Sequence, residues 1–315
     1  MTVELPQQVE SAIAELKSFQ DGDLGVVHVI GCGEQAIPAL RTMLFEREPS
    51  GLYQARCRAV EALAALGAYD VLIGFLEAER KIIDPVERMG EDAVINAAAL
   101  ALANARDQHV FELLLRLARR PALTGIVGAL GAFENVDAIP VLIDALEEDA
   151  SRRTAEAALR KLGRSARASL LRAVDLKMPS GERESESSAR RRRSALGLLA
   201  EMDGWRGTWQ TLRHLVHDDD AKVAALACEI GLARAGSAER PGLVRRLIEL
   251  LAQENWVLRK EIESCLAAHF GRAQEVIERY LNEFLLRGDS VATRKQIEAA
   301  LRRVVAQARH ISRAQ

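Results

Sequence analysis

Small and apolar residues recur along the chain at spacings that keep them on one face of a helix. The clearest pattern is R-x-x-A-x-x-A-L, in which steps of three, three and one residue align the apolar positions. Its two strict copies are Arg56, Ala59, Ala62 and Leu63, and then Arg152, Ala155, Ala158 and Leu159. Looser copies begin at Arg192, Arg259 and Arg294. The pattern predicts helices that bury this face against closely approaching neighbours.

Each strict copy is preceded by a second predicted helix that opens with the same residues. AIPAL and AIPVL place Pro38 and Pro140 in a first helical turn, where no backbone N–H is required. Gly67 and Gly163 follow the second helix, at the left-handed position that ends many helices. The unit is therefore helix A, a turn and helix B, with a repeat of about 35 residues.

This period divides the chain into about nine helix pairs. The expected A helices cover 6–18, 36–46, 69–80, 108–120, 138–148, 166–177, 207–216, 241–253 and 273–286. The expected B helices cover 22–31, 53–66, 92–104, 122–132, 151–162, 188–202, 220–234, 256–269 and 290–307. Three turns from helix A to helix B are longer than the others, at 46–51, 80–92 and 178–193.

These residues resemble the HEAT repeat, and in particular the short bacterial form known from phycobiliprotein lyases. The resemblance runs from about residue 5 to 308. It implies an all-α fold, a right-handed HEAT/armadillo-like α-solenoid of about nine stacked helix pairs, as a single array over residues 1–315. It also implies that B helices line the concave surface and A helices the convex one. Such a repeat specifies architecture and leaves the activity open.

Composition agrees with a helical chain. Of the 315 residues 49% are apolar but only 4% are aromatic, because alanine and leucine, both strong helix formers, make up the difference. No stretch approaches the ~18–20 uninterrupted apolar residues of a membrane helix, and the first residues lack a signal-peptide pattern. We therefore expect a cytoplasmic protein. We expect buried free thiols at the four widely spaced cysteines, Cys32, Cys57, Cys228 and Cys265.

Charge is divided unevenly along the chain, although the net charge is only −2. The acidic half, residues 1–150, carries 12 lysines and arginines against 24 acidic residues. The basic half, residues 151–315, carries 31 against 21. This division indicates a charged partner, and it is also compatible with head-to-tail self-association of the chain.

The third long turn leads into a run of four arginines. Residues 178–190 are rich in Ser, Glu and Arg and lack apolar anchors, so we expect a mobile insertion there. The run then opens a helix, where cations are unfavourable and an anionic partner would stabilise them. Pairing with acidic residues just upstream is the competing interpretation. The candidate partner-binding residues are this run and two further basic pairs: Arg190, Arg191, Arg192, Arg193, Arg245, Arg246, Arg302 and Arg303.

The arginines of the repeated pattern have two interpretations. In the first, they form a ladder by bonding to acidic or carbonyl groups of the neighbouring repeat. In the second, they face a ligand in the concave groove.

Motifs for chemistry are incomplete in this sequence, which predicts no catalytic residue, no cofactor and no metal site. The G-x-G-x-x-A run that starts at Gly31 lacks the strand and βαβ unit of a dinucleotide site, so its glycines are interpreted as a break between helices. His214 and His217 precede three aspartates, but an acidic turn with a capping Asp explains them without a metal.

The main functional hypothesis is a non-enzymatic scaffold or adaptor. It would bind a partner protein through the concave helix-B face and the edge formed by the A–B turns. One alternative is nucleic-acid binding through the basic half, as in HEAT-like DNA glycosylases, with three tryptophans as possible base contacts. The other alternative is a chromophore lyase or chaperone-like factor, which the repeat subtype implies.

Overall fold

A computed structural model describes residues 5–46, 53–118, 123–181, 183–202, 208–252, 255–283 and 291–314. Within these residues the structure is almost entirely helical, and the helices pack in consecutive pairs. None of the helices formed by these residues is long and apolar enough to cross a membrane.

The first helices of the pairs match the expected A helices. They are α1 (Leu5–Leu16), α3 (Ile37–Phe45), α5 (Tyr69–Glu77), α7 (Gln108–Leu117), α9 (Ile139–Asp144), α11 (Arg167–Asp175), α13 (Thr208–Leu212), α15 (Arg240–Leu250) and α17 (Phe270–Glu283). Short 3₁₀ segments extend several of them, such as Gly33–Ala36 before α3 and Arg213–His217 after α13.

The second helices of the pairs match the expected B helices. They are α2 (Gly22–Gly31), α4 (Gln54–Ala65), α6 (Pro85–Leu102), α8 (Thr124–Phe133), α10 (Asp149–Leu162), α12 (Glu186–Glu201), α14 (Ala221–Arg234), α16 (Trp256–Ala268) and α18 (Val291–Ala314). Most ends lie within about two residues of the expected positions.

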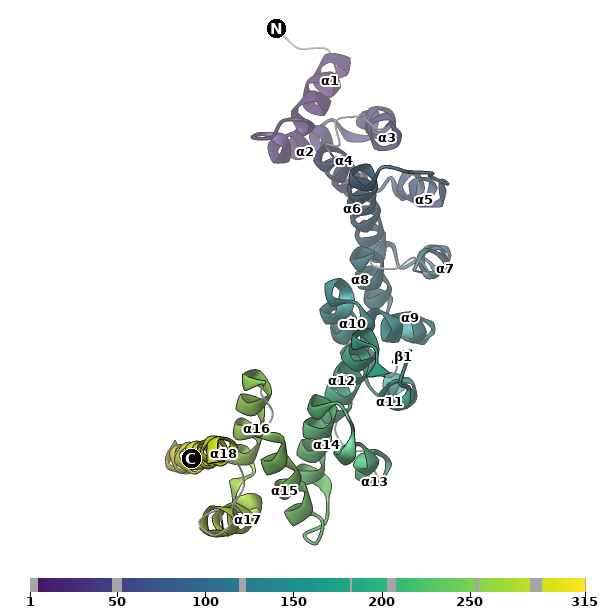
Figure 1. The fold of residues 1–315 in the computed structure, drawn as a ribbon. Coiled ribbons are helices and arrows are strands. Elements are labelled where there is room, and N and C mark those ends of the chain that lie inside the picture. Colours follow the sequence, from purple (N-terminus) through teal and green to yellow (C-terminus); the bar gives the residue numbers. More distant parts are fainter. Residues whose placement is uncertain are drawn as a thin grey trace. The chain divides into compact units, whose positions relative to one another are not determined.

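The chain divides into two compact units, Met1–Ser169 and Leu170–Gln315. In the first unit the helices α2, α4, α6, α8 and α10 each pack on the next and form one layer. The helices α3, α5, α7 and α9 lie on one side of that layer (Figure 1). In the second unit α12 packs on α14 and α16 packs on α18, while α15 packs on both α14 and α17.

The signature residues form the core between these helices. Ala59, Ala62 and Leu63 are fully buried, as are Ala155 and Leu159. Small residues allow backbones to approach. A Cβ added to Gly125 of α8 would lie 2.5 Å from the carbonyl oxygen of Asn96 in α6. The prediction of close helix packing along this face is therefore confirmed.

Prolines and glycines mark the beginnings and ends of several helices at the positions expected from the sequence. Pro38 and Pro140 occupy the first turn of α3 and α9. Gly67 and Gly163 have positive φ values of 72° and 54°, which glycine adopts without steric cost. Gly33 also has a positive φ and follows directly after α2, so the G-x-G run is a break between helices.

Two turns differ from the expectation. Helix α6 begins at Pro85 instead of residue 92, because the Asp84 carboxylate caps it by accepting hydrogen bonds from the backbone N–H groups of Val86 and Glu87 at 2.8 and 2.9 Å. The third long turn contains a short antiparallel hairpin of β1 (Pro179–Ser180) and β2 (Arg183–Glu184). Ser185 then caps α12.

Candidate partner-binding edges

Large apolar side chains are exposed at the first two long turns of the first unit. Phe45 and Tyr53 flank one turn. Ile83, which is 91% exposed, lies on the other, and Val86 and Met89 follow it at the start of α6. We call these five residues the unit-1 edge. The starts of α4 and α6 adjoin each other, because a Cβ on Gly90 of α6 would lie 3.2 Å from Cδ1 of Tyr53, which precedes α4. Arg88 donates to the carbonyl oxygen of Ile82 at 2.9 Å and holds the second turn against α6.

A buried ion-pair network supports the unit-1 edge from beneath. The Glu91 carboxylate accepts from Nη1 of Arg56 at 2.6 Å and pairs with Nε of Arg80 at 2.7 Å. Nε of Arg56 also donates to the carbonyl oxygen of Leu44 at 2.9 Å. These contacts join the end of α3, the start of α4 and the start of α6. Both guanidinium groups lie over the Phe75 ring, at 5.6 and 3.9 Å from its centroid.

A hollow of about 500 Å³ opens beside this edge, between α1, α3 and α4. Ile13, Phe19 and Met43 give it apolar walls, and Glu46 and Gln54 border it where the first long turn begins and ends.

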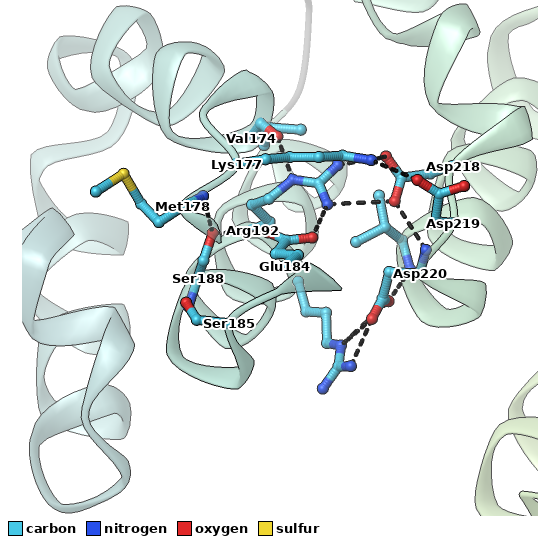
Figure 2. A network of polar contacts seen from close by, with 12 residues as sticks. Val174, Lys177, Met178, Glu184, Ser185, Ser188, Arg192, Asp218, Asp219 and Asp220 are labelled. Carbon is cyan, nitrogen blue, oxygen red and sulfur yellow. Dashed lines mark hydrogen bonds and ion pairs between the residues drawn. The ribbon is translucent and has the colours of Figure 1, made fainter. Parts of the chain in front are cut away.

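The second unit repeats this construction around Arg192 (Figure 2). Nε of Arg192 donates to the carbonyl oxygen of Val174 at 2.7 Å, at the end of α11. Its Nη1 donates to Glu184 of the hairpin at 2.7 Å, and the guanidinium also pairs with Asp218 before α14. Lys177 adds an ion pair to Asp218 at 3.2 Å. The network therefore fixes the hairpin against the next helix pair.

Charge and burial oppose each other in this network. Burial alone would raise the pKa of Asp218, but hydrogen bonds from Arg192 and from the backbone N–H of Asp220 outweigh it, so the pKa is lowered. Burial would likewise lower the pKa of Arg192, but Asp218 and Glu184 raise it. Both groups therefore stay charged in the folded protein over the ordinary pH range.

The four arginines of the run lie in different environments. Arg192 is 0% exposed and Arg191 is also buried, where its Nη2 donates to the carbonyl oxygen of Leu176 at 2.8 Å. Arg193 pairs with Asp220 and Glu186, and Arg190 is half-buried. Arg192 and Arg193 thus bind carboxylates within the protein, and the partner-binding role of the run stays a prediction.

The other basic candidates lie on α15 and α18. Arg245 on α15 is exposed, whereas its neighbour Arg246 donates to the carbonyl oxygen of Val216 at 3.0 Å. Arg302 pairs with Glu298 on its own helix α18. Arg303 is exposed but reaches the buried Glu263 of α16 at 2.6 Å.

The ladder interpretation of the repeated arginines is confirmed for Arg56 and Arg192. Each donates from Nε to the last turn of helix A and from its Nη atoms to a carboxylate in a later pair. Arg152 departs from the ladder and pairs with Asp149 on its own helix. The side chain of Arg294 lies outside the described residues. The competing interpretation of the arginine run, pairing with acidic residues just upstream, is confirmed for Glu184 with Arg192 and for Glu186 with Arg193. The partners Glu91 and Asp218 were missed, because they lie 35 and 26 residues away in sequence.

No group of three or more His, Cys, Asp or Glu side chains in the described part of the chain is arranged to hold a metal ion. Of the four free thiols, Cys228 and Cys265 are buried as expected, while Cys32 and Cys57 are only half-buried.

Comparison with solved structures finds a likeness over most of the chain. The chain is similar to a solved structure described as the complex of CpcE and CpcF of phycocyanin lyase from Nostoc sp. PCC7120. The identity is 24%, the match covers 77% of this chain and 94% of that chain, and the TM-score is 0.34. No protein-family model and no curated protein matches the chain.

Proposed function

We propose that this protein is a non-enzymatic scaffold that holds a partner protein along its A–B turns and its B-helix face. One observation carries the proposal. Among the described residues, seven of the fourteen large apolar side chains that are exposed lie at the ends of the three long A–B turns or within them, and buried ion pairs hold the helices that these turns join. The seven are Phe45, Tyr53, Ile83, Val86, Met89, Leu176 and Met178.

Apolar side chains gathered on a fixed edge are characteristic of an interface. Contiguous exposed apolar patches on soluble proteins mark sites of interaction, and aromatic and Met side chains are enriched in interface cores. The Arg56–Glu91 pair keeps the unit-1 edge in place before a partner arrives. Pre-ordering reduces the entropy lost on binding and so increases affinity.

The proposed architecture is one array of about nine helix pairs that wind as a right-handed superhelix over residues 1–315. It is supported by the regular alternation of A and B helices and by the stacking of α2 to α10. Such arrays present extended surfaces to which several segments of one partner can bind.

Nucleic-acid binding is less well supported than protein binding. Phosphate contacts require arginines or lysines that are free to face the backbone of a nucleic acid. In the run that suggested this function, Arg191 and Arg192 are buried and Arg193 is held by Asp220 and Glu186. Carboxylates within the protein therefore neutralise Arg192 and Arg193, two of the four cations of this run.

A pull-down from native extract, with and without nuclease, tests the scaffold. Wild type is compared with Val86→Glu at the unit-1 edge and with Val136→Glu, which places the same change at another exposed valine. We expect a protein that wild type and Val136→Glu retain after nuclease and that Val86→Glu loses at least about tenfold, since a charge would be buried in the interface. Retention of nucleic acid alone would overturn the proposal, and so would full binding by Val86→Glu.

A further inference from the structure

The layer of B helices in the second unit is interrupted between α14 and α16. Helix α12 packs closely on α14, and α16 packs closely on α18, but α14 and α16 touch over only a few residues. A groove of about 580 Å³ opens between them. We call it the α14–α16 groove.

The walls of this groove have the form that receives a helix. On α14 the lining residues Lys222, Leu226 and Glu229 are spaced four and three residues apart, so they form one row along the helix. On α16 the small residues Ser264 and Ala268 form a similar row, and further apolar residues such as Leu247 close the floor. Rows of this kind with small residues between them allow a third helix to pack closely.

Charges at the groove leave one carboxylate without a partner. Lys222 and Glu261 form an ion pair across the mouth, and Lys260 reaches Glu263 at 3.3 Å. Among the described residues, no hydrogen bond or ion pair involves Glu229. Burial, and with it the nearby charge of Glu261, raises the pKa of Glu229 against the opposing effect of Lys222. The Glu229 side chain is exposed at the groove, so its carboxylate can pair with a cation from a partner.

An exposed tryptophan lies at the start of the groove wall. Trp256 is the first residue of α16 and is 68% exposed, and Val257 beside it is also exposed. Trp256 is one turn before Lys260 on the same side of the helix. Tryptophan is the residue type most enriched among those that dominate interface binding energies.

We propose that the α14–α16 groove binds an amphipathic helix of a partner protein, with a lysine or arginine of that helix paired to Glu229. The apolar face of the bound helix covers Leu226 and Leu247, and one of its ends packs on Trp256. This inference rests on the proposed scaffold function and names a second, separate contact. The exposed Lys222–Glu261 pair contributes little in water and can open as the helix enters.

A phage-displayed library of helix-forming peptides, panned against the full-length protein, tests this inference. We expect enriched peptides that combine an apolar face with a lysine or arginine. Their affinity should fall about tenfold or more with Glu229→Lys, since like charges then face each other across the contact. Ser264→Trp, which fills the groove from an exposed position, should abolish binding. Glu278→Lys on α17 is the matched control and should change affinity less than twofold.

Three results would overturn the groove inference. They are no enrichment over panning against Ser264→Trp, enrichment of peptides without a basic residue, and equal binding to wild type and Glu229→Lys. Self-association of wild type that Ser264→Trp abolishes in sedimentation velocity would also overturn it, because the occupant would then be a second copy. None of these results changes the Val86→Glu experiment, so failure of the groove and failure of the scaffold are distinguishable.

Discussion

Replacing Arg192 with methionine is expected to loosen the junction between the hairpin, α12 and α14. The substitution keeps a long apolar stem of similar length but removes the guanidinium. Glu184 and Asp218 then remain in the interior without their main counter-ion, and the carbonyl oxygen of Val174 loses its donor. Leaving a buried charge or carbonyl without a partner costs more free energy of folding than the attraction within the ion pair had contributed.

The structure limits the size of this effect. Removing one partner of a buried ion pair costs about 3–5 kcal/mol. Lys177 still reaches Asp218 at 3.2 Å, and the hydroxyl of Ser188 still donates to Glu184 at 2.6 Å. Because these contacts survive, we expect the lower end of the range, about 3 kcal/mol. This corresponds to roughly a hundredfold change in the local opening equilibrium.

Hydrogen exchange measured by residue distinguishes this local opening from global unfolding. Repeat arrays open in parts, so amides of α12 and the start of α14 should exchange roughly a hundredfold faster in Arg192→Met. Helices α4 and α6 of the first unit should be unchanged. The control is Arg302→Met, where the arginine is 74% exposed in its ion pair and the loss should stay below about 1 kcal/mol. Equal protection in Arg192→Met and wild type would refute the reasoning.

Three further predictions follow from burial and close packing. Gly125→Ala should destabilise the first unit by about 1–3 kcal/mol in urea unfolding, because its Cβ would meet the α6 backbone. The Cβ of Gly128→Ala meets only side chains, so this variant should be as stable as wild type or more stable in the same measurement. Burial first, and then nearby acidic groups, raise the pKa of Cys228 and Cys265 to about 12, so neither thiol should react with a disulfide reagent at pH 8 until the protein unfolds. Hydrogen bonds to Asp218 outweigh burial and lower its pKa below 3.8, the ordinary value of an aspartate. The stability that Asp218 contributes is therefore complete above pH 3.8 and is lost as pH falls through the folded pKa. Acid titration of Asp218→Asn should lack this loss.

The helices could be predicted because their ends are set by neighbouring residues. Proline in a first turn, glycine with positive φ and the R-x-x-A-x-x-A-L spacing are local features, and α10 begins and ends within about two residues of where they indicate. The start of α6 was also signalled, by Asp84 followed by Pro85, but the length of the preceding turn obscured it. The hairpin after α11 has no local pattern of alternating residues, since each strand is two residues long.

The candidate sites were harder to predict because they depend on pairing between distant residues. From the sequence alone, four consecutive arginines indicate a solvent-exposed surface that binds anions. Whether Arg192 is buried depends on Asp218, which lies 26 residues further along the chain. In the same way, the groove exists because α14 and α16 separate, which depends on how α15 is placed between them.

The arginines of the second unit also change what its positive charge means. Arg234 donates to the carbonyl oxygens of Ala200 and Met202, at the end of α12, and Arg272 donates to that of Leu232. Because the last carbonyls of a helix lack partners within the helix, these contacts stabilise helix ends and join successive pairs. Much of the arginine in this unit therefore serves its own fold. The number of basic residues thus overstates the attraction of this unit for an anionic partner. The exposed apolar edges and the α14–α16 groove are better indications of where a partner protein binds.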